Sequence, residues 1–167
     1  KTIAIDLLTN ENDGLGAARH FQRCLPSPIP RFQAELTHLP FRDEQFDAII
    51  FNASFHYSDS YEATLREALR CLKPQVLVII SDTPWYSNDE SGRQMMAERH
   101  TAFRQKFGTA SDSVKSLEYL TDERLKGLEE ALAVTLAIYR PWYGLKWAMR
   151  PWIAKLRGRR EPSRFRI

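Results

Sequence analysis

The feature that most restricts the fold is a strand–helix–strand order in the middle of the chain. Residues 46–51 and 76–80 are short apolar runs rich in β-branched residues, which is typical of buried strands. Between them, residues 60–72 have the apolar spacing of an amphipathic helix, with one face formed by Leu65, Ala68, Leu69 and Leu72. Two strands joined through a helix normally lie parallel in one sheet, so this order predicts an α/β fold.

Further segments extend the α/β pattern toward both ends of the chain. We expect strands at 2–8, 32–36, 133–139 and 163–167, and helices at 14–21, at 88–108 and after Thr121. The whole of 1–167 is therefore predicted to be a single Rossmann-like domain with a mostly parallel sheet and helices on both faces. A length of 167 residues, with 43% hydrophobic and 27% charged residues, is enough for one globular core.

Composition narrows the location and chemistry of the protein. No apolar run approaches the roughly 18 residues of a transmembrane segment, and no signal peptide follows Lys1, so we expect a cytoplasmic protein. Cys24 and Cys71 form no paired motif, which favours reduced thiols, and neither has a basic neighbour that would make it a nucleophile. The four histidines are scattered without metal-ligand spacing, so no metal is expected.

The positive charge is concentrated at the end of the chain. Residues 140–167, the basic Trp/Arg-rich part, hold nine Lys/Arg and one acid, Glu161, which gives this part a charge of +8. Since the net charge of the whole chain is +3, residues 1–139 carry −5. Such a segment can bind nucleic acid or an anionic surface. The alternative, which we favour, is that its tryptophans pack on the domain while its arginines face water.

Polar residues follow each predicted strand. They are Asp6, Glu35, residues 52–56 and residues 82–86. Ligands of parallel α/β sheets bind at the carboxyl ends of the strands, so these residues are predicted to line one crevice. Asp47 precedes its strand, and we expect it to stabilise the strand entry through hydrogen bonds to the preceding turn.

Four motifs, taken in order, resemble a known family. They are LPFRDEQFDAII (39–50), SFHY (54–57), TLREALRCLKP (64–74) and VLVIISDTPWY (76–86). In this order they are similar to the class I S-adenosylmethionine-dependent methyltransferases, specifically the type 11-like group. The resemblance is close over residues 1–86 and looser over 117–167.

The resemblance implies a set of cofactor residues. Asp6 corresponds to the acid that accepts hydrogen bonds from the ribose hydroxyls, where a carboxylate and a diol make charge-assisted bonds. Glu35 corresponds to the acid near the adenine amino group, and Leu36 would pack on the base. Asn52 and Ala53 correspond to the segment beside the methionine arm of S-adenosylmethionine.

The resemblance also implies a substrate side. His56 and Tyr57 match a pair that faces the methyl acceptor, and His56 is the candidate catalytic base, although packing against Tyr57 would explain the histidine equally well. Asp82, Trp85 and Tyr86 are candidate substrate contacts, and Asp82 could instead cap the next turn. Residues 86–116 are predicted to form a helical lid inserted above the crevice.

The sequence departs from the family in two places. Where the family has a glycine pair after L-K-P, this chain has Gln75-Val76, which alters a turn. The D/E-x-G-x-G loop that precedes the ribose acid is missing before Asp6, so the chain is expected to be N-terminally truncated by one strand and that loop. Without them, the strands of Asp6 and Asp47 would have to pair directly or leave a gap, and we expect weak cofactor binding and no measurable methylation.

The predicted function is methyl transfer from S-adenosylmethionine to a small-molecule acceptor, a reaction that depends mainly on alignment and needs no metal. One alternative is a methyltransferase-like module that binds or scaffolds without catalysis. Another is a nucleotide-dependent oxidoreductase, which would need a G-x-G-x-x-G turn that this chain does not contain.

Overall fold

The structure is a computed structural model that describes residues 1–110 and 115–167, so residues 111–114 of the predicted lid lie outside the described residues. The chain divides into two compact units. Unit 1 consists of Lys1–Asp47 and Ala63–Val76, and unit 2 consists of Ala48–Glu62 and Leu77–Ile167. Each unit is described by itself below, and the single domain over 1–167 stays a prediction.

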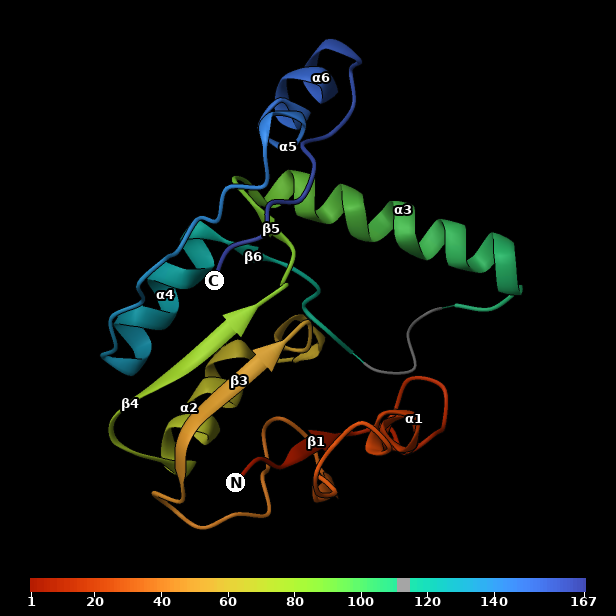
Figure 1. The fold of residues 1–167 in the computed structure, drawn as a ribbon. Helices are drawn as coiled ribbons and strands as arrows, with labels where there is room; N and C mark the ends of the chain where they lie inside the picture. The colour runs from red at the N-terminus through yellow and green to blue at the C-terminus, as the bar shows by residue number, and fades with distance from the viewer. Residues whose placement is uncertain (111–114) are drawn as a thin grey trace. The chain divides into compact units, whose positions relative to one another are not determined.

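The chain combines short strands with helices along its length (Figure 1). In chain order they are β1 (Ala4–Asp6), the 3-10 helix η1 (Leu15–Ala18), α1 (Arg19–Gln22), β2 (Arg31–Gln33), β3 (Phe46–Asn52), the 3-10 helix η2 (Phe55–Tyr57), α2 (Tyr61–Cys71), β4 (Leu72–Ser81), β5 (Trp85–Tyr86), α3 (Asp89–Phe107), β6 (Leu120–Thr121), α4 (Asp122–Leu132), α5 (Leu145–Ala148) and α6 (Arg150–Leu156).

The strands pair as β1–β2, β3–β4 and β5–β6. The first and third pairs are parallel, and Figure 1 shows the arrows of β3 and β4 pointing the same way. This confirms the predicted α/β fold with parallel strands. None of the helices in 1–110 and 115–167 is long and apolar enough to cross a membrane.

Unit 1 contains the β1–β2 pair. Ala4 lies opposite Arg31 and Asp6 lies opposite Gln33, so the two strands end at nearly the same level. Gly14 lets the connecting loop pass close to the chain after β1, because a Cβ there would lie 2.5 Å from the carbonyl oxygen of Leu8. A larger residue at this position would displace the loop that follows Asp6.

The LPF motif is held in unit 1 by two charged residues of α2. Arg70 donates to the carbonyl oxygens of Leu39 (3.3 Å) and Phe41 (3.0 Å), and its Nη1 lies 2.5 Å from Asp43. Glu67 accepts from the Leu39 N–H at 2.8 Å and from Arg70 at 2.7 Å. The spacing of leucine, phenylalanine and aspartate in this motif therefore has a structural role, which is to tie the loop before β3 to the helix that follows it.

Unit 2 has an aromatic core around η2. Phe55 is fully buried, its ring stacks on Tyr61 at 4.6 Å between centroids, and it meets Phe51 edge-on at 5.3 Å. The Tyr61 hydroxyl donates to the carbonyl oxygen of Tyr119 at 2.9 Å. These contacts fix the short turn after β3 to the segment that leads into β6.

The helix predicted at 88–108 is confirmed as α3 in unit 2. Asn88 caps it by accepting from the Ser91 N–H at 2.9 Å, and Gly108 ends it in the left-handed conformation with φ of 70°. Gly92 allows the helix to lie against the ring of Tyr119, since a Cβ at this position would come within 2.2 Å of that ring.

The strand predicted at 133–139 is wrong, and the one at 163–167 is reduced to isolated pairs. After α4, Ala133 turns left-handed, and the N–H groups of Val134 and Leu136 donate to the backbone and side chain of Glu129. These donors are therefore not available to a neighbouring strand. Further along, backbone hydrogen bonds join Tyr139 to Ile167, and Arg164 bridges to Trp85.

Burial also differs from the sequence-based expectation. The run 76–80 was expected to be covered on both faces, but Leu77 is 69% exposed, as is Ile50 of the paired β3 at 63%. In α2, Leu65 and Ala68 are buried as predicted, whereas Leu69 is 37% exposed. Apolar composition thus predicted the strand and the helix, while the tertiary structure decided which of their side chains are covered.

Candidate functional site

In unit 2, the carboxyl ends of β3 and β4 form a strained pair of turns. Ala53 directly after β3 has φ of 50°, and Asp82 directly after β4 has φ of 52°. The Ala53 N–H donates to the Ser81 carbonyl oxygen at 3.0 Å, and the Ser81 hydroxyl donates to Oδ1 of Asn52 at 2.9 Å. Left-handed residues other than glycine are costly and concentrate at functional sites, so this end of the strands is the candidate ligand edge of unit 2.

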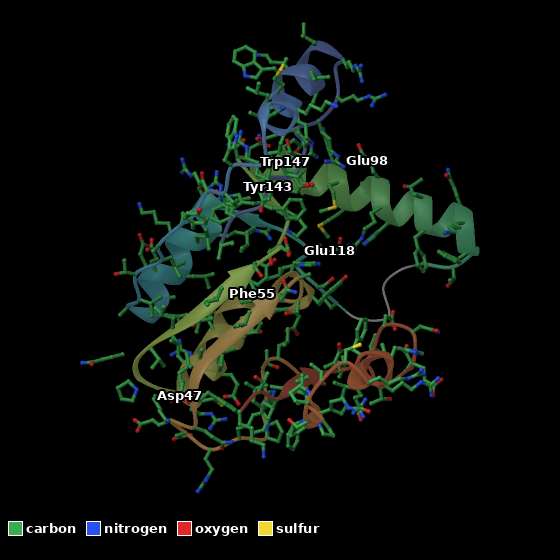
Figure 2. All side chains as sticks on the ribbon, viewed as in Figure 1. Asp47, Phe55, Glu98, Glu118, Tyr143 and Trp147 are labelled. Carbon is green, nitrogen blue, oxygen red and sulfur yellow. The ribbon has the colours of Figure 1, made fainter. Side chains whose placement is uncertain are left out.

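His56 lies three residues beyond Ala53, in η2. It is 7% exposed, and the buried Phe55 beside it holds the turn in place (Figure 2). The His56 carbonyl oxygen accepts from the Glu118 N–H at 2.8 Å, and its ring lies 4.3 Å from that of Tyr57. Nδ1 of His56 is buried without a hydrogen-bond partner in the described part of the chain, so a ligand could use this nitrogen only if the turn around it opened.

Electrostatics favour the neutral form of His56. Burial and then the nearby Arg99 charge lower its pKa below the ordinary 6.5, while Glu118 acts in the opposite direction. A neutral imidazole at neutral pH can accept a proton, which is the property that a general base requires. Both readings of this histidine are thus compatible with the structure, because it packs on Tyr57 and also keeps an unused ring nitrogen.

Glu118 is a site residue that the sequence did not reveal. It is 3% exposed and has φ of 65°, and its Oε1 accepts from Arg99 at 2.5 Å and lies 3.1 Å from Nε2 of His100. Its other oxygen, Oε2, is buried without a partner among the described residues. A single acid in the run SLEYL carries no sequence signal, and only the tertiary pairing of this segment with η2 brings it beside the backbone of His56.

The predicted substrate residues fall into two groups. Asp82 and Tyr57 are exposed, with Tyr57 at 55%. Trp85 and Tyr86 are buried at 5% and 1%, and the indole N–H of Trp85 donates to Asp122 at 2.9 Å. A substrate could reach Trp85 or Tyr86 only if the core of unit 2 opened, so their burial gives no support to a substrate role.

In unit 1, Asp6 and Glu35 lie at the ends of neighbouring parallel strands. Asp6 is the last residue of β1, and Glu35 comes two residues after the end of β2. Oδ1 of Asp6 accepts from the Leu8 N–H at 2.8 Å, which orients the carboxylate, and its Oδ2 accepts no hydrogen bond from the described residues. Glu35 is exposed and Leu36 is half-buried beside it. A free carboxylate oxygen fits the requirement for binding a ribose diol.

Asp47 has a different partner from the one expected. Its Oδ1 lies 2.7 Å from Nζ of Lys73, and this contact lowers the pKa of the Asp47 carboxyl. The predicted hydrogen bonds to the preceding turn are replaced by this ion pair across the start of β3 and β4. Both side chains are largely exposed, so the pair is a surface contact.

Fold and strand-end geometry define an α/β protein with a candidate ligand edge at the carboxyl ends of parallel strands. Residues 4–80 match the family model of the methyltransferase domain. This part of the chain, a little under half of its length, is therefore similar to a methyltransferase domain. None of the curated proteins compared with the chain matches it.

Solved structures share the fold of this chain. A protein from Bacillus halodurans assigned as a methyltransferase is 22% identical with a TM-score of 0.56, covering 78% of this chain and 52% of that one. The YcgJ protein of Bacillus subtilis is 15% identical with a TM-score of 0.60, covering 83% and 56%. An S-adenosylmethionine-dependent methyltransferase of Methanosarcina mazei is 11% identical with a TM-score of 0.58, covering 99% and 78%. The chain thus spans about half the length of the first two of these proteins.

Proposed function

We propose that this chain takes part in the transfer of a methyl group from S-adenosylmethionine to a small-molecule acceptor. The observation that carries the proposal is the methyltransferase-domain match over residues 4–80. That range includes every proposed cofactor residue and the candidate base, namely Asp6, Glu35, Leu36, Asn52, Ala53 and His56.

The proposed role of unit 1 is to hold the nucleoside part of the cofactor. Asp6 would accept hydrogen bonds from the ribose hydroxyls, because its carboxylate is oriented by Leu8 and retains an oxygen for a ligand. Glu35, exposed after β2, would accept from the adenine amino group, and Leu36 would contact the base.

The segment that follows β3 is proposed to contact the methionine arm and the acceptor. Asn52 and the left-handed Ala53 present side-chain and backbone polar groups at the end of β3. When bound, S-adenosylmethionine supplies an activated methyl group for in-line displacement. His56 would remove the acceptor proton as the nucleophile attacks, with Tyr57 and Asp82 as the exposed contacts to the acceptor.

The helix α3 is the proposed lid within residues 86–116. Its first turns are fixed by the contact of Gly92 with Tyr119, whereas Phe107 in its last turn is 57% exposed. A helix anchored at one end and largely exposed at the other is suited to limited movement. Hydrogen exchange tests this point, because amides of the last turns should exchange faster than those of β4.

Ligand-observed NMR with S-adenosylhomocysteine tests the cofactor role of Asp6, since it detects dissociation constants into the millimolar range. Asp6→Asn should weaken binding by about tenfold or more, because a charge-assisted hydrogen bond becomes a neutral one. Asp13→Asn, an exposed acid in the same unit, should leave binding unchanged. Equal affinities of the two variants would contradict the ribose role, and binding without methyl transfer to any acceptor would favour the non-catalytic module.

A further inference from the structure

The segment around α5 and α6 exposes an unusual number of large apolar side chains. We call this surface the aromatic-basic patch. Its exposed apolar members are Trp142 (72%), Leu145 (72%), Met149 (54%), Trp152 (74%) and Leu156 (87%). Five such side chains within 15 residues are more than the scattered exposure expected of a surface, and patches of this kind mark interaction sites.

Helix geometry gathers these side chains into pairs. Trp152 and Leu156 are four residues apart in α6 and lie on the same face, and Leu145 and Met149 have the same spacing at α5. Trp147 fixes the segment from inside, since its ring lies 5.1 Å from Tyr143 and 5.8 Å from Phe165 (Figure 2). The exposed pairs are therefore presented by an anchored structure.

The cations of the basic part are used in two different ways. Arg160, Arg164 and Arg166 form ion pairs inside unit 2 with Glu98, Glu161 and Asp122. In contrast, Lys155, Arg157 and Arg159 are exposed and have no carboxylate within ion-pair distance in the described residues. Three unpaired positive charges thus lie at the end of α6, close in the chain to Trp152 and Leu156.

An open cavity of about 820 Å³ lies on the face of α6 that carries Arg150, Ile153 and Ala154, away from Trp152 and Leu156. Four arginines contribute to its lining, together with Gln94 and Glu98 of α3. They are Arg150, Arg157, Arg159 and Arg160. One acid against four guanidinium groups leaves the cavity strongly positive, and guanidinium groups bind phosphate through paired hydrogen bonds.

We propose that the aromatic-basic patch docks on an anionic phospholipid membrane, with Trp152 and Leu156 inserted between headgroups and lipid phosphates at the exposed cations Lys155, Arg157 and Arg159. Membrane segments that lie at the lipid–water interface typically combine Trp, Leu and Met with unpaired Lys and Arg, as this patch does. Nucleic acid explains it less well, because Leu145, Met149 and Leu156 cannot stack on bases as aromatic side chains do. The proposal goes beyond methyl transfer, since it assigns a location to the enzyme and no chemistry.

Co-sedimentation of the 167-residue chain with vesicles tests the proposal. The chain should bind phosphatidylcholine vesicles that contain 30% phosphatidylglycerol, on the order of the anionic fraction that attracts polybasic segments, and should bind pure phosphatidylcholine weakly. Trp152→Ser with Leu156→Ser should lower the partition coefficient by about 100-fold or more, the loss expected for two buried apolar side chains. Arg157→Gln with Arg159→Gln should lower it by about 25-fold, or fivefold per cation.

Matched controls separate the patch from general surface effects. Leu77→Ser changes an apolar residue of similar exposure (69%) in β4, and Lys126→Gln with Lys106→Gln removes two exposed cations elsewhere in unit 2. Both should bind vesicles like the parent chain. Circular dichroism would show that each variant is folded, and the replaced patch residues are exposed, so no folding defect is expected.

Three results would overturn the proposal. One is equal partition into anionic and neutral vesicles, and another is equal loss in the patch and control variants. The third is binding of a single-stranded RNA by the parent chain, but not by the patch variants, while vesicles stay unbound. Glycerol phosphate at matched ionic strength separates the sources of phosphate. A membrane site should resist it, whereas full displacement from vesicles would show a site for a free phosphorylated molecule.

Discussion

The replacement Phe55→Ala tests how the structure holds the candidate base. Phe55 is fully buried between the rings of Phe51 and Tyr61 and directly precedes His56 in η2. Truncating a buried phenylalanine to alanine costs about 3–5 kcal/mol, because apolar contacts are lost and a cavity remains. The free energy of unfolding of a small domain is only about 5–15 kcal/mol, so this loss would remove a large part of it. The turn that holds His56 should become looser as a result.

Urea denaturation followed by circular dichroism measures this loss. With a slope of about 2 kcal/mol per molar urea, a loss of about 4 kcal/mol lowers the midpoint by about 2 M. The matched control is Phe107→Ala, the same change at a side chain that is 57% exposed at the end of α3. Its midpoint should fall by less than about 0.5 M, because a half-exposed ring loses less contact on truncation.

The comparison of the two urea midpoints tests whether Phe55 anchors a packed core. If Phe55→Ala and Phe107→Ala unfold at the same urea concentration, Phe55 does not anchor a packed core and the account of the His56 turn is wrong. If Phe55→Ala is destabilised as expected, the Tyr57 ring beside His56 should also become more mobile, which the line widths of its NMR signals would show.

Two further predictions concern backbone strain and protonation. Gln75 has φ of 64°, so Gln75→Gly should relieve backbone strain and raise the free energy of unfolding by up to about 1 kcal/mol. The control Gln105→Gly, inside α3, should lower the free energy of unfolding by about 1 kcal/mol. The opposite order of the two variants in urea denaturation would refute the strain at Gln75. Burial lowers the pKa of His56 in the folded protein, so near and below pH 6.5 the unfolded chain binds more protons than the folded one. The contribution of His56 to the free energy of unfolding should therefore be fully present above about pH 7.5 and should fall as the pH drops through 6.5. His56→Gln should flatten this pH dependence in urea titrations at pH 7.5 and 5.5, and the exposed His38→Gln should not.

The sequence alone determined the central strand–helix–strand unit and the similarity of residues 4–80 to a methyltransferase domain. The apolar runs at β3 and β4 and the spacing of α2 predicted a strand–helix–strand unit because these patterns depend only on neighbours along the chain. Asn88 and Thr121 predicted helix starts for the same reason, since a capping side chain bonds to the backbone three residues on. The order of the motifs then placed Asp6, Glu35 and His56 at strand ends or just beyond them.

Only the tertiary structure decided which side chains are covered and which partners they have. Trp85 and Tyr86 follow a strand like typical ligand residues, but contacts with distant segments bury them, whereas Leu77 lies in an apolar run and is exposed. Glu118 meets Arg99 and His100 only because α3 packs against a segment separated from it in sequence. Burial and pairing between distant segments depend on how the chain packs, and local periodicity carries no information about that packing.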